Sequence, residues 1–319
     1  MKHLFFGFII FAALITYALR LVQSQSTTGC TSQPRKELVL TVTDKTGNVI
    51  DSLRAEHLSL KVGGSNATIF HVAFRNNDQP LDLVVLIDAS VSQESVLPLA
   101  KVGARSFINS VATDGRDRVA IVSFSNKPIT NAVLTADFSV VAAAIEQIKI
   151  DKPTGYIGGG VVVSTRPPKK LDIPGSTSLW DAIQNTTQAL FGAKPEKRRR
   201  AMLVFSDGND TSSSTTLNAA IEEATKQDIT LFSIGLAGPN FSVTEKELKK
   251  LSEQTGGVAS FPKTKEAFET ALTDIAKRLR ANYVIGYCGE LKGKVQVELA
   301  DPELKKAKLV LAYRKYVSQ

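Results

Sequence analysis

Short apolar runs alternate with longer amphipathic stretches through the middle of the chain, residues 81–280. Each run has about the length of one buried strand, and between the runs apolar residues recur at helical spacing. This alternation predicts an α/β fold class with a doubly wound, mostly parallel, Rossmann-like sheet. Strands are expected at 82–87, 118–124, 201–205, 230–234 and 258–261, and helices at 94–111, 140–148, 178–191, 217–227, 244–255 and 266–279.

Residues 36–74 and 282–319 follow a different pattern, in which apolar and polar residues alternate and Gly or Asn marks the turns. Period two indicates β-strands and hairpins. Neither end is large enough for a good core of its own. We therefore expect both ends to pair in one small β-sandwich, with the α/β domain inserted between them.

Residues 1–24 have the pattern of a signal peptide, because Lys2 precedes an apolar stretch at 4–19 that is followed by Arg20 and small or polar residues. As a helix, 16 residues span about 24 Å, which is short of the roughly 30 Å hydrocarbon core. We therefore expect cleavage after Ser24 and a secreted, periplasmic or cell-envelope location. The alternative is that the segment stays uncleaved as an N-terminal anchor.

Cys30 and Cys288 are the only cysteines, and an exported chain is free to oxidise them. One long-range disulfide would stabilise the fold by roughly 5 kcal/mol in the chain-entropy model. Spacing alone does not show whether the two sulfur atoms meet. A disulfide and two unpaired thiols therefore both stay open.

The composition, with 43% hydrophobic and 22% charged residues over 319 positions, is that of a globular protein. The formal net charge of +8 includes Lys2 and Arg20, and much of the rest of the excess lies in local clusters such as residues 197–200. A run of this kind is usually a solvated loop. Because the cluster has no interleaved aromatic residues and the chain is expected to be exported, we predict no nucleic-acid partner.

Oxygen-bearing side chains follow two of the predicted strands. Asp88, Ser90 and Ser92 form an Asp-x-Ser-x-Ser turn after the first strand of the middle region, and Asp207 follows the run at 201–206. Thr177 comes just before a predicted helix. Hard cations such as Mg²⁺, Mn²⁺ and Ca²⁺ prefer oxygen ligands, and ligands in doubly wound sheets bind beyond the carboxyl ends of the strands. The sequence therefore predicts a divalent-cation site made of these five residues.

The stretch 152–174, rich in Gly and Pro, fits neither a strand nor a helix of the sheet. It reads as an inserted loop with a hairpin as one option, and it leads directly to Thr177. Long loops are usually functional or disordered. Its place beside the predicted cation favours a role in partner selection.

Enzymatic chemistry finds little support among the residues. After signal removal the remaining histidines are His57 and His71, both in the N-terminal β-region, so no Ser-His-Asp arrangement can form around the Asp88 loop. The sequence has no phosphate-binding P-loop and no zinc-binding His-Glu-x-x-His helix. Metal-assisted hydrolysis stays an alternative, but Asp210, the nearest further acid, reads as a loop residue. We predict that the protein is not an enzyme.

The middle domain resembles the von Willebrand factor type A domain. Asp88, Ser90 and Ser92 stand where that family has its Asp-x-Ser-x-Ser, while Thr177 and Asp207 match its distal threonine and aspartate. The resemblance implies a metal-ion-dependent adhesion site at which the three hydroxyls hold the cation and the two aspartates contribute charge. Where the family usually has two glycines before the threonine, this chain has Gly175-Ser176, and the 152–174 insertion is longer than usual.

The resemblance also implies a function. In this family a bound Mg²⁺, with Mn²⁺ or Ca²⁺ as alternatives, recognises an Asp or Glu offered by a protein partner. The flanks around 42–47 and 283–287 are similar to those of exported bacterial proteins related to these domains. We therefore expect an exported, cation-dependent protein-binding module. The alternatives are a structural envelope component with a purely structural metal, and the metal-assisted hydrolase.

Overall fold

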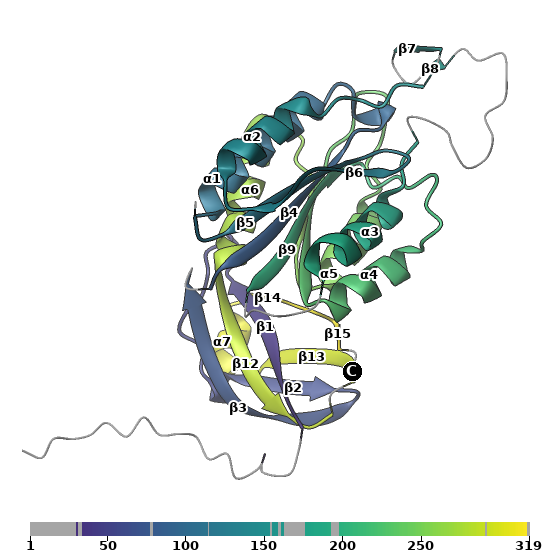
Figure 1. Cartoon of the computed structure of the whole chain (residues 1–319). Coiled ribbons are helices and arrows are strands. Elements are labelled where there is room, and N and C mark those ends of the chain that lie inside the picture. The colour runs from purple at the N-terminus through teal and green to yellow at the C-terminus, as the bar shows by residue number, and fades with distance from the viewer. Residues whose placement is uncertain are drawn as a thin grey trace, which may run out of the picture.

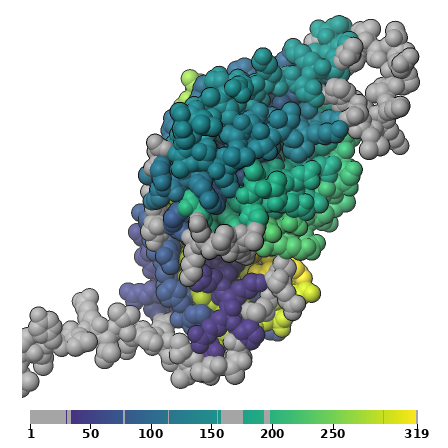
Figure 2. All heavy atoms as spheres, in the orientation of Figure 1, coloured from purple at the N-terminus to yellow at the C-terminus, as the bar shows by residue number. Residues whose placement is uncertain are grey.

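The computed structural model describes residue 30 and residues 34–76, 79–113, 115–153, 155–158, 161–162, 176–192, 198–290 and 292–317. Figure 1 shows an α/β unit made by the middle of the chain and, below it, a β unit made by both ends. In the space-filling view of Figure 2, purple N-terminal and yellow C-terminal atoms gather in the lower unit. The two chain ends therefore share one unit, and the α/β unit is inserted between them.

The α/β unit is built on a six-stranded sheet. All eight residues of its central strand β4 are buried, as expected for a strand that is covered on both faces. Neighbouring strands are parallel except for the last pair, β5 and β6. The strand order is β11 (Ala259–Ser260), β10 (Ile229–Gly235), β9 (Arg199–Ser206), β4 (Leu81–Asp88), β5 (Arg118–Phe124) and β6 (Pro128–Thr135).

Helices cover both faces of this sheet (Figure 1). Along β4, Leu83, Val85 and Ile87 pack with one set of helices, and Val84 and Leu86 pack with the other, because successive side chains of a strand point to opposite faces. The first set is α1 (Leu97–Val111), α2 (Phe138–Gln147) and α6 (Lys265–Arg280), and the second is α3 (Leu179–Phe191), α4 (Leu217–Lys226) and α5 (Glu245–Gln254).

The expected α/β architecture is confirmed, with one strand that the pattern did not indicate and one hairpin that it gave as an option. Strand β6 is an antiparallel edge strand, and its mixed sequence from Pro128 onward lacks the apolar run of the buried strands. Part of the stretch 152–174 forms a small antiparallel hairpin of β7 (Tyr156–Gly158) and β8 (Val161–Val162). The part of that stretch beyond β8, residues 163–174, lies outside the described residues.

The β unit is one seven-stranded sheet in which N-terminal and C-terminal strands alternate. Its central strand β12 pairs with β1 on one side and with β3 on the other, all antiparallel. The strand order is β14 (Val310–Tyr313), β1 (Arg35–Thr43), β12 (Ala281–Cys288), β3 (Ser65–Asn76), β2 (Leu58–Val62), β13 (Gly293–Leu299) and β15 (Tyr316–Val317); α7 (Pro302–Lys306) and the short 3-10 helix η2 (Ala55–His57) lie in connections.

A sandwich of two separate sheets, as predicted from the alternating pattern, is not confirmed. Hydrogen bonding continues from strand to strand through the whole order, and the sheet folds over so that its own inner face forms the core. The Tyr313 hydroxyl on edge strand β14 lies 3.5 Å from the carbonyl oxygen of Val297 on β13, near the opposite edge. Strong twist, helped by the bulge between Gly286 and Tyr287, lets one sheet enclose a core.

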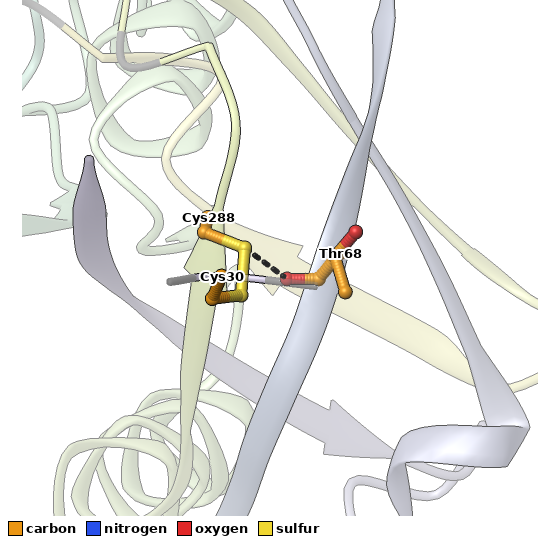
Figure 3. The surroundings of a disulfide bond; sticks show 3 residues. All are labelled: Cys30, Thr68 and Cys288. Atoms are coloured by element: carbon orange, nitrogen blue, oxygen red, sulfur yellow. Dashed lines mark hydrogen bonds between the residues drawn. A yellow bond between two sulfur atoms is a disulfide. The ribbon is translucent and has the colours of Figure 1, made fainter. Parts of the chain in front are cut away.

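Cys30 and Cys288 form a disulfide across 258 positions of the sequence (Figure 3). Cys288 ends β12, and its register partner on β3 is Thr68. Both cysteines are buried. The bond therefore fastens the first described residue of the chain to the central strand of the β unit. Among the described residues, no helix combines the length and the apolar character needed to cross a bilayer.

Reduction of this disulfide is expected to lower the thermal unfolding temperature of the β unit, because the unfolded chain regains the freedom of a very long loop. The chain-entropy model puts the effect at about 5 kcal/mol. Calorimetry with and without reductant measures it, and the double variant Cys30→Ser/Cys288→Ser serves as the control that reductant should not affect. An unfolding temperature of the unaltered protein that reductant leaves unchanged contradicts the prediction.

Candidate metal centre

The sheet brings two aspartates to its carboxyl edge. Asp88 is the last residue of β4, and Asp207 directly follows β9. These strands are parallel neighbours, with Ile87 opposite Phe205. The chain moves outward from this pair in both directions, to β5 on one side and to β10 on the other, so the two aspartates flank the point where strand order reverses.

Asp88 is almost completely buried, with 1% of its surface exposed. Ser206 donates a hydrogen bond of 2.6 Å from its hydroxyl to Oδ2, and the backbone N–H of Ser90 donates one of 2.9 Å to Oδ1. Burial and the neighbouring negative charge of Asp207 nevertheless raise the pKa of Asp88 from 3.8 to about 7. In the absence of a cation, the ionised form of this carboxyl is therefore disfavoured.

Burial also raises the pKa of the Asp207 carboxyl. Hydrogen bonds from the Ser92 and Gln93 side chains and from the Asn209 backbone N–H lower this pKa but do not offset the effect of burial. Its Oδ1 accepts the Asn209 N–H at 2.9 Å. Two carboxyl groups thus lie close together in a site that disfavours the ionised form of each. A divalent cation at this place would neutralise both.

The hydroxyls of Ser90 and Ser92 lie beside these carboxylates. Ser90 precedes the 3-10 helix η3 (Val91–Gln93), and its Oγ is 3.1 Å from the Oγ of Ser92. The Gln93 side-chain amide donates to the Ser92 Oγ at 3.3 Å and to the Leu236 carbonyl at 3.1 Å. Gln93 therefore holds the turn against the loop that follows β10.

Thr177 lies two residues before α3 and is held by its backbone. Its N–H donates to the Thr211 hydroxyl at 2.9 Å, and its carbonyl accepts the N–H groups of Thr211 and Ser212 at 2.8 and 3.1 Å. The next residue, Ser178, donates its N–H to the Ser125 carbonyl just beyond β5, at 2.7 Å. The Thr177 hydroxyl makes none of these contacts and remains a candidate cation ligand.

Two further aspartates shape the loops without belonging to the donor set. Asp210 accepts the Trp180 N–H at 3.1 Å and the Ser213 hydroxyl at 2.5 Å, so it ties the loop after β9 to the first turn of α3. Asp181 accepts the N–H groups of Ser214 and Thr215 at 2.9 and 2.8 Å. Asp210 thus has the contacts of the loop residue that the sequence indicated.

The structure therefore brings Asp88, Ser90, Ser92 and Asp207 into one contact network, and it ties the Thr177 loop to the loops after β5 and β9. The described residues contain no group of three or more His, Cys, Asp or Glu side chains that could hold a metal. A site here depends on hydroxyls, which suit Mg²⁺ and other hard cations. Two carboxylates and three hydroxyls fit such an ion in both charge and donor chemistry.

Sequence reasoning missed three supporting residues: Ser206, Gln93 and Gly208. Gly208 has φ +76°, and a Cβ there would lie 2.7 Å from Leu248 Cγ, so the turn after Asp207 needs glycine. The signal was present, because Ser206 and Gly208 flank Asp207 directly. Gln93 could not be found in this way, since its partner Leu236 is distant in sequence.

The inserted stretch begins against the same loops. The Asp151 N–H donates to the Ala89 carbonyl at 2.9 Å, and the Asp151 carboxylate accepts the Ser125 hydroxyl at 2.7 Å. Glu94 pairs with Lys152 at 2.6 Å and accepts the hydroxyl of Tyr156 on β7. Hairpin β7–β8 is thereby anchored to the turn that carries Ser90 and Ser92.

Comparison with known families agrees with this geometry. One family model described as von Willebrand factor type A domain matches residues 83–209, and a second with the same description matches residues 170–278. Together they cover most of the α/β unit. The chain belongs to the von Willebrand factor type A domain proteins, as the resemblance predicted.

The solved structures that resemble this chain have low sequence identity to it. The conserved hypothetical protein BatB from Bacteroides thetaiotaomicron is 16% identical with a TM-score of 0.45, over 62% of this chain and 98% of its own. A von Willebrand factor type A protein from Catenulispora acidiphila is 13% identical with a TM-score of 0.49, over 85% and 71%. Proximal thread matrix protein 1 from the mussel byssus, solved with a zinc-occupied MIDAS motif, is 13% identical with a TM-score of 0.49, over 70% and 50%. No curated protein matches the chain.

Mg²⁺ or Mn²⁺ is expected to raise the thermal unfolding temperature, and a chelator should reverse the rise, because an ion that binds only the folded state stabilises it by mass action. At a concentration of 100 times Kd the gain is about 2.7 kcal/mol. Differential scanning fluorimetry measures the shift, and Asp207→Asn should abolish it. Equal unfolding temperatures with saturating cation and with chelator contradict the site.

The pH dependence of the metal-free protein follows from Asp88. Because its folded pKa lies near 7 and its ordinary value is 3.8, the folded state holds the proton more tightly, so stability falls as pH rises from about 4 to about 7. The loss is at most about 4 kcal/mol. Asp88→Asn should remove this component and make the metal-free protein more stable than wild type at about pH 8 but not at about pH 4. Denaturant titrations in chelator measure the difference, and parallel pH profiles of the two proteins contradict it.

Proposed function

We propose that this protein is an exported module that binds a protein partner through a divalent cation held by Asp88, Ser90, Ser92, Thr177 and Asp207. The partner offers an Asp or Glu carboxylate to the cation. The observation that carries the proposal is the pair of buried carboxyls whose pKa values are raised, with the Ser90 and Ser92 hydroxyls beside them. The physiological ion we propose is Mg²⁺, because the site is rich in oxygen ligands and would keep some waters.

The hydrogen bonds between the loops support a cation that recognises a partner over a cation with a purely structural role. Backbone hydrogen bonds of Thr177 with Thr211 and Ser212 already fix the Thr177 loop against the loop after β9. Asp210 and Asp181 add to this by accepting the N–H groups of Trp180 and Ser214. These contacts leave the Thr177 hydroxyl to a cation, which would add charge to loops that protein groups already join. Its contribution is charge, which is what a partner carboxylate recognises.

Export is supported by two features. The apolar stretch near the N-terminus has the pattern of a signal peptide, and the Cys30–Cys288 disulfide suits an oxidising compartment. A secreted, periplasmic or cell-envelope location agrees with both. No nucleic acid is proposed as a partner.

Binding without catalysis is supported by the position of the histidines. His57 belongs to η2 and His71 to β3, both in the β unit, whereas the candidate cation ligands lie at the carboxyl edge of the α/β sheet. The other nearby acids are engaged by neighbouring groups: Asp210 by Trp180 and Ser213, Asp181 by Ser214 and Thr215, Asp151 by Ser125, and Glu94 by Lys152 and Tyr156. The described part of the site thus lacks an evident general base for hydrolysis.

Thr177→Val tests the proposal, because the substitution deletes a hydroxyl while retaining volume and leaves the backbone hydrogen bonds of the loop in place. The assay selects a displayed random-peptide library on the protein in Mg²⁺ and elutes it with chelator. Chelator-eluted peptides are expected to be enriched in Asp or Glu. Thr177→Val should reduce their retention at least about tenfold, which corresponds to about 1.4 kcal/mol.

Thr187→Val is the matched control, since Thr187 is a buried threonine of α3 whose hydroxyl has no hydrogen-bond partner. It should leave peptide retention unchanged. If Thr177→Val lowers the unfolding temperature in Mg²⁺ but retains the acidic peptides as wild type does, the metal is structural and the proposed function is wrong.

A further inference from the structure

A cavity of about 630 Å³ lies beside the candidate metal centre. It is bounded by the start of α1, the loop between β10 and α5, and the start of α6, all at the carboxyl edge of the sheet. This volume is in the range of sites that hold small ligands. Its wall is mainly apolar and includes Val96, Leu99, Leu236, Phe241, Phe261 and Phe268.

The cavity shares a wall with the turn that carries Ser90 and Ser92. The Gly238 N–H donates to the Ser92 carbonyl at 3.3 Å, and the Gln93 amide donates to the Leu236 carbonyl at 3.1 Å. A Cβ at Gly238 would lie 2.8 Å from the Ser95 hydroxyl, so the two loops are in direct contact. The loop that lines the cavity is thus the one against which the Ser92 turn rests.

The mouth of the cavity has features of a binding surface. Phe241 is 37% exposed there, and its backbone N–H donates to the Gly238 carbonyl in a tight turn. Lys263 and Lys265 line the rim and are exposed, and Lys265 also pairs with Glu269 at 3.9 Å. The acid at the rim, Glu245, is engaged by Lys249 at 2.9 Å. An apolar hollow with lysines at its edge suits an acidic segment that also carries an apolar side chain.

We infer that this cavity is a second subsite of the proposed recognition site and takes a large apolar side chain from the same partner segment that gives its carboxylate to the cation. The inference rests on the proposed function. The occupant is an extended peptide with Asp or Glu for the cation and, within a few residues, Leu, Met or an aromatic residue for the cavity. Burial of such a side chain contributes selectivity that a carboxylate alone lacks, since many exposed segments offer a carboxylate.

The displayed-peptide selection tests this. Peptides retained in Mg²⁺ and eluted by chelator are expected to carry a large apolar residue at a fixed offset from the acid, at least about tenfold above its frequency in the unselected library. Phe241→Ser removes part of the apolar wall, and Ser242→Trp fills the mouth from an exposed lining position. Both variants should lose the apolar preference while the Mg²⁺-dependent shift in unfolding temperature stays as in wild type.

Val102→Ser is the matched control, because Val102 is an apolar residue of α1 that is 55% exposed and does not line the cavity. It should keep both the metal shift and the apolar preference. Chelator-eluted acidic peptides without an apolar preference, or a preference that survives in Phe241→Ser and Ser242→Trp, overturn the subsite and leave the proposed function standing. If Mg²⁺ still shifts the unfolding temperature but no acidic peptides elute with chelator, the proposed function is wrong and the subsite with it.

Discussion

The close approach of two buried carboxyls, Asp88 and Asp207, is the constraint on which the candidate site depends. Each is placed by a strand that is buried along nearly its whole length, so neither side chain can move to solvent without disturbing the sheet. Burial raises the pKa of both carboxyls, and the charge of Asp207 adds to the effect on Asp88. Two buried carboxylates without a counter-charge cost free energy, and a bound cation would lower that cost. The two carboxyls therefore fit a site that needs a bound cation to balance its charge.

The sheet topology explains why these two residues meet. Strands β4 and β9 are neighbours although more than a hundred residues separate them, and the chain leaves this pair in opposite directions. The loops at such a point diverge and leave room for a ligand. The same edge also gathers the start of the inserted stretch, through Asp151 and Glu94, and the loop after β10, through Gly238. Parts of the chain that have little in common in sequence thus surround one site.

Much of the α/β unit could be predicted because its strands are short apolar runs and its helices are amphipathic; the expected run 118–124 coincides with β5. Strand β6 could not, since an edge strand is half exposed and its register with β5 is irregular. The β unit was predicted as a sandwich because alternation shows which face of a strand is buried but not which strands pair. The five candidate ligands followed from a motif with fixed spacing. Of their supports, Ser206 and Gly208 left a local signal because they flank Asp207, whereas Gln93 left none because its hydrogen bond to Leu236 joins residues distant in sequence.

The hydrogen bonds around Thr177 bear on how the site would discriminate between partners. A loop that is held by protein hydrogen bonds would lose little conformational entropy on binding, so more of the free energy of the contact between the cation and the partner carboxylate would be available for affinity. Two protein carboxylates already match the charge of a divalent ion, however, and a third from the partner makes the site net negative. The electrostatic gain is consequently limited, and a partner that binds well needs apolar burial nearby. The apolar wall around Phe241 lies beside the turn that carries Ser92, where such burial would add to a contact at a bound cation.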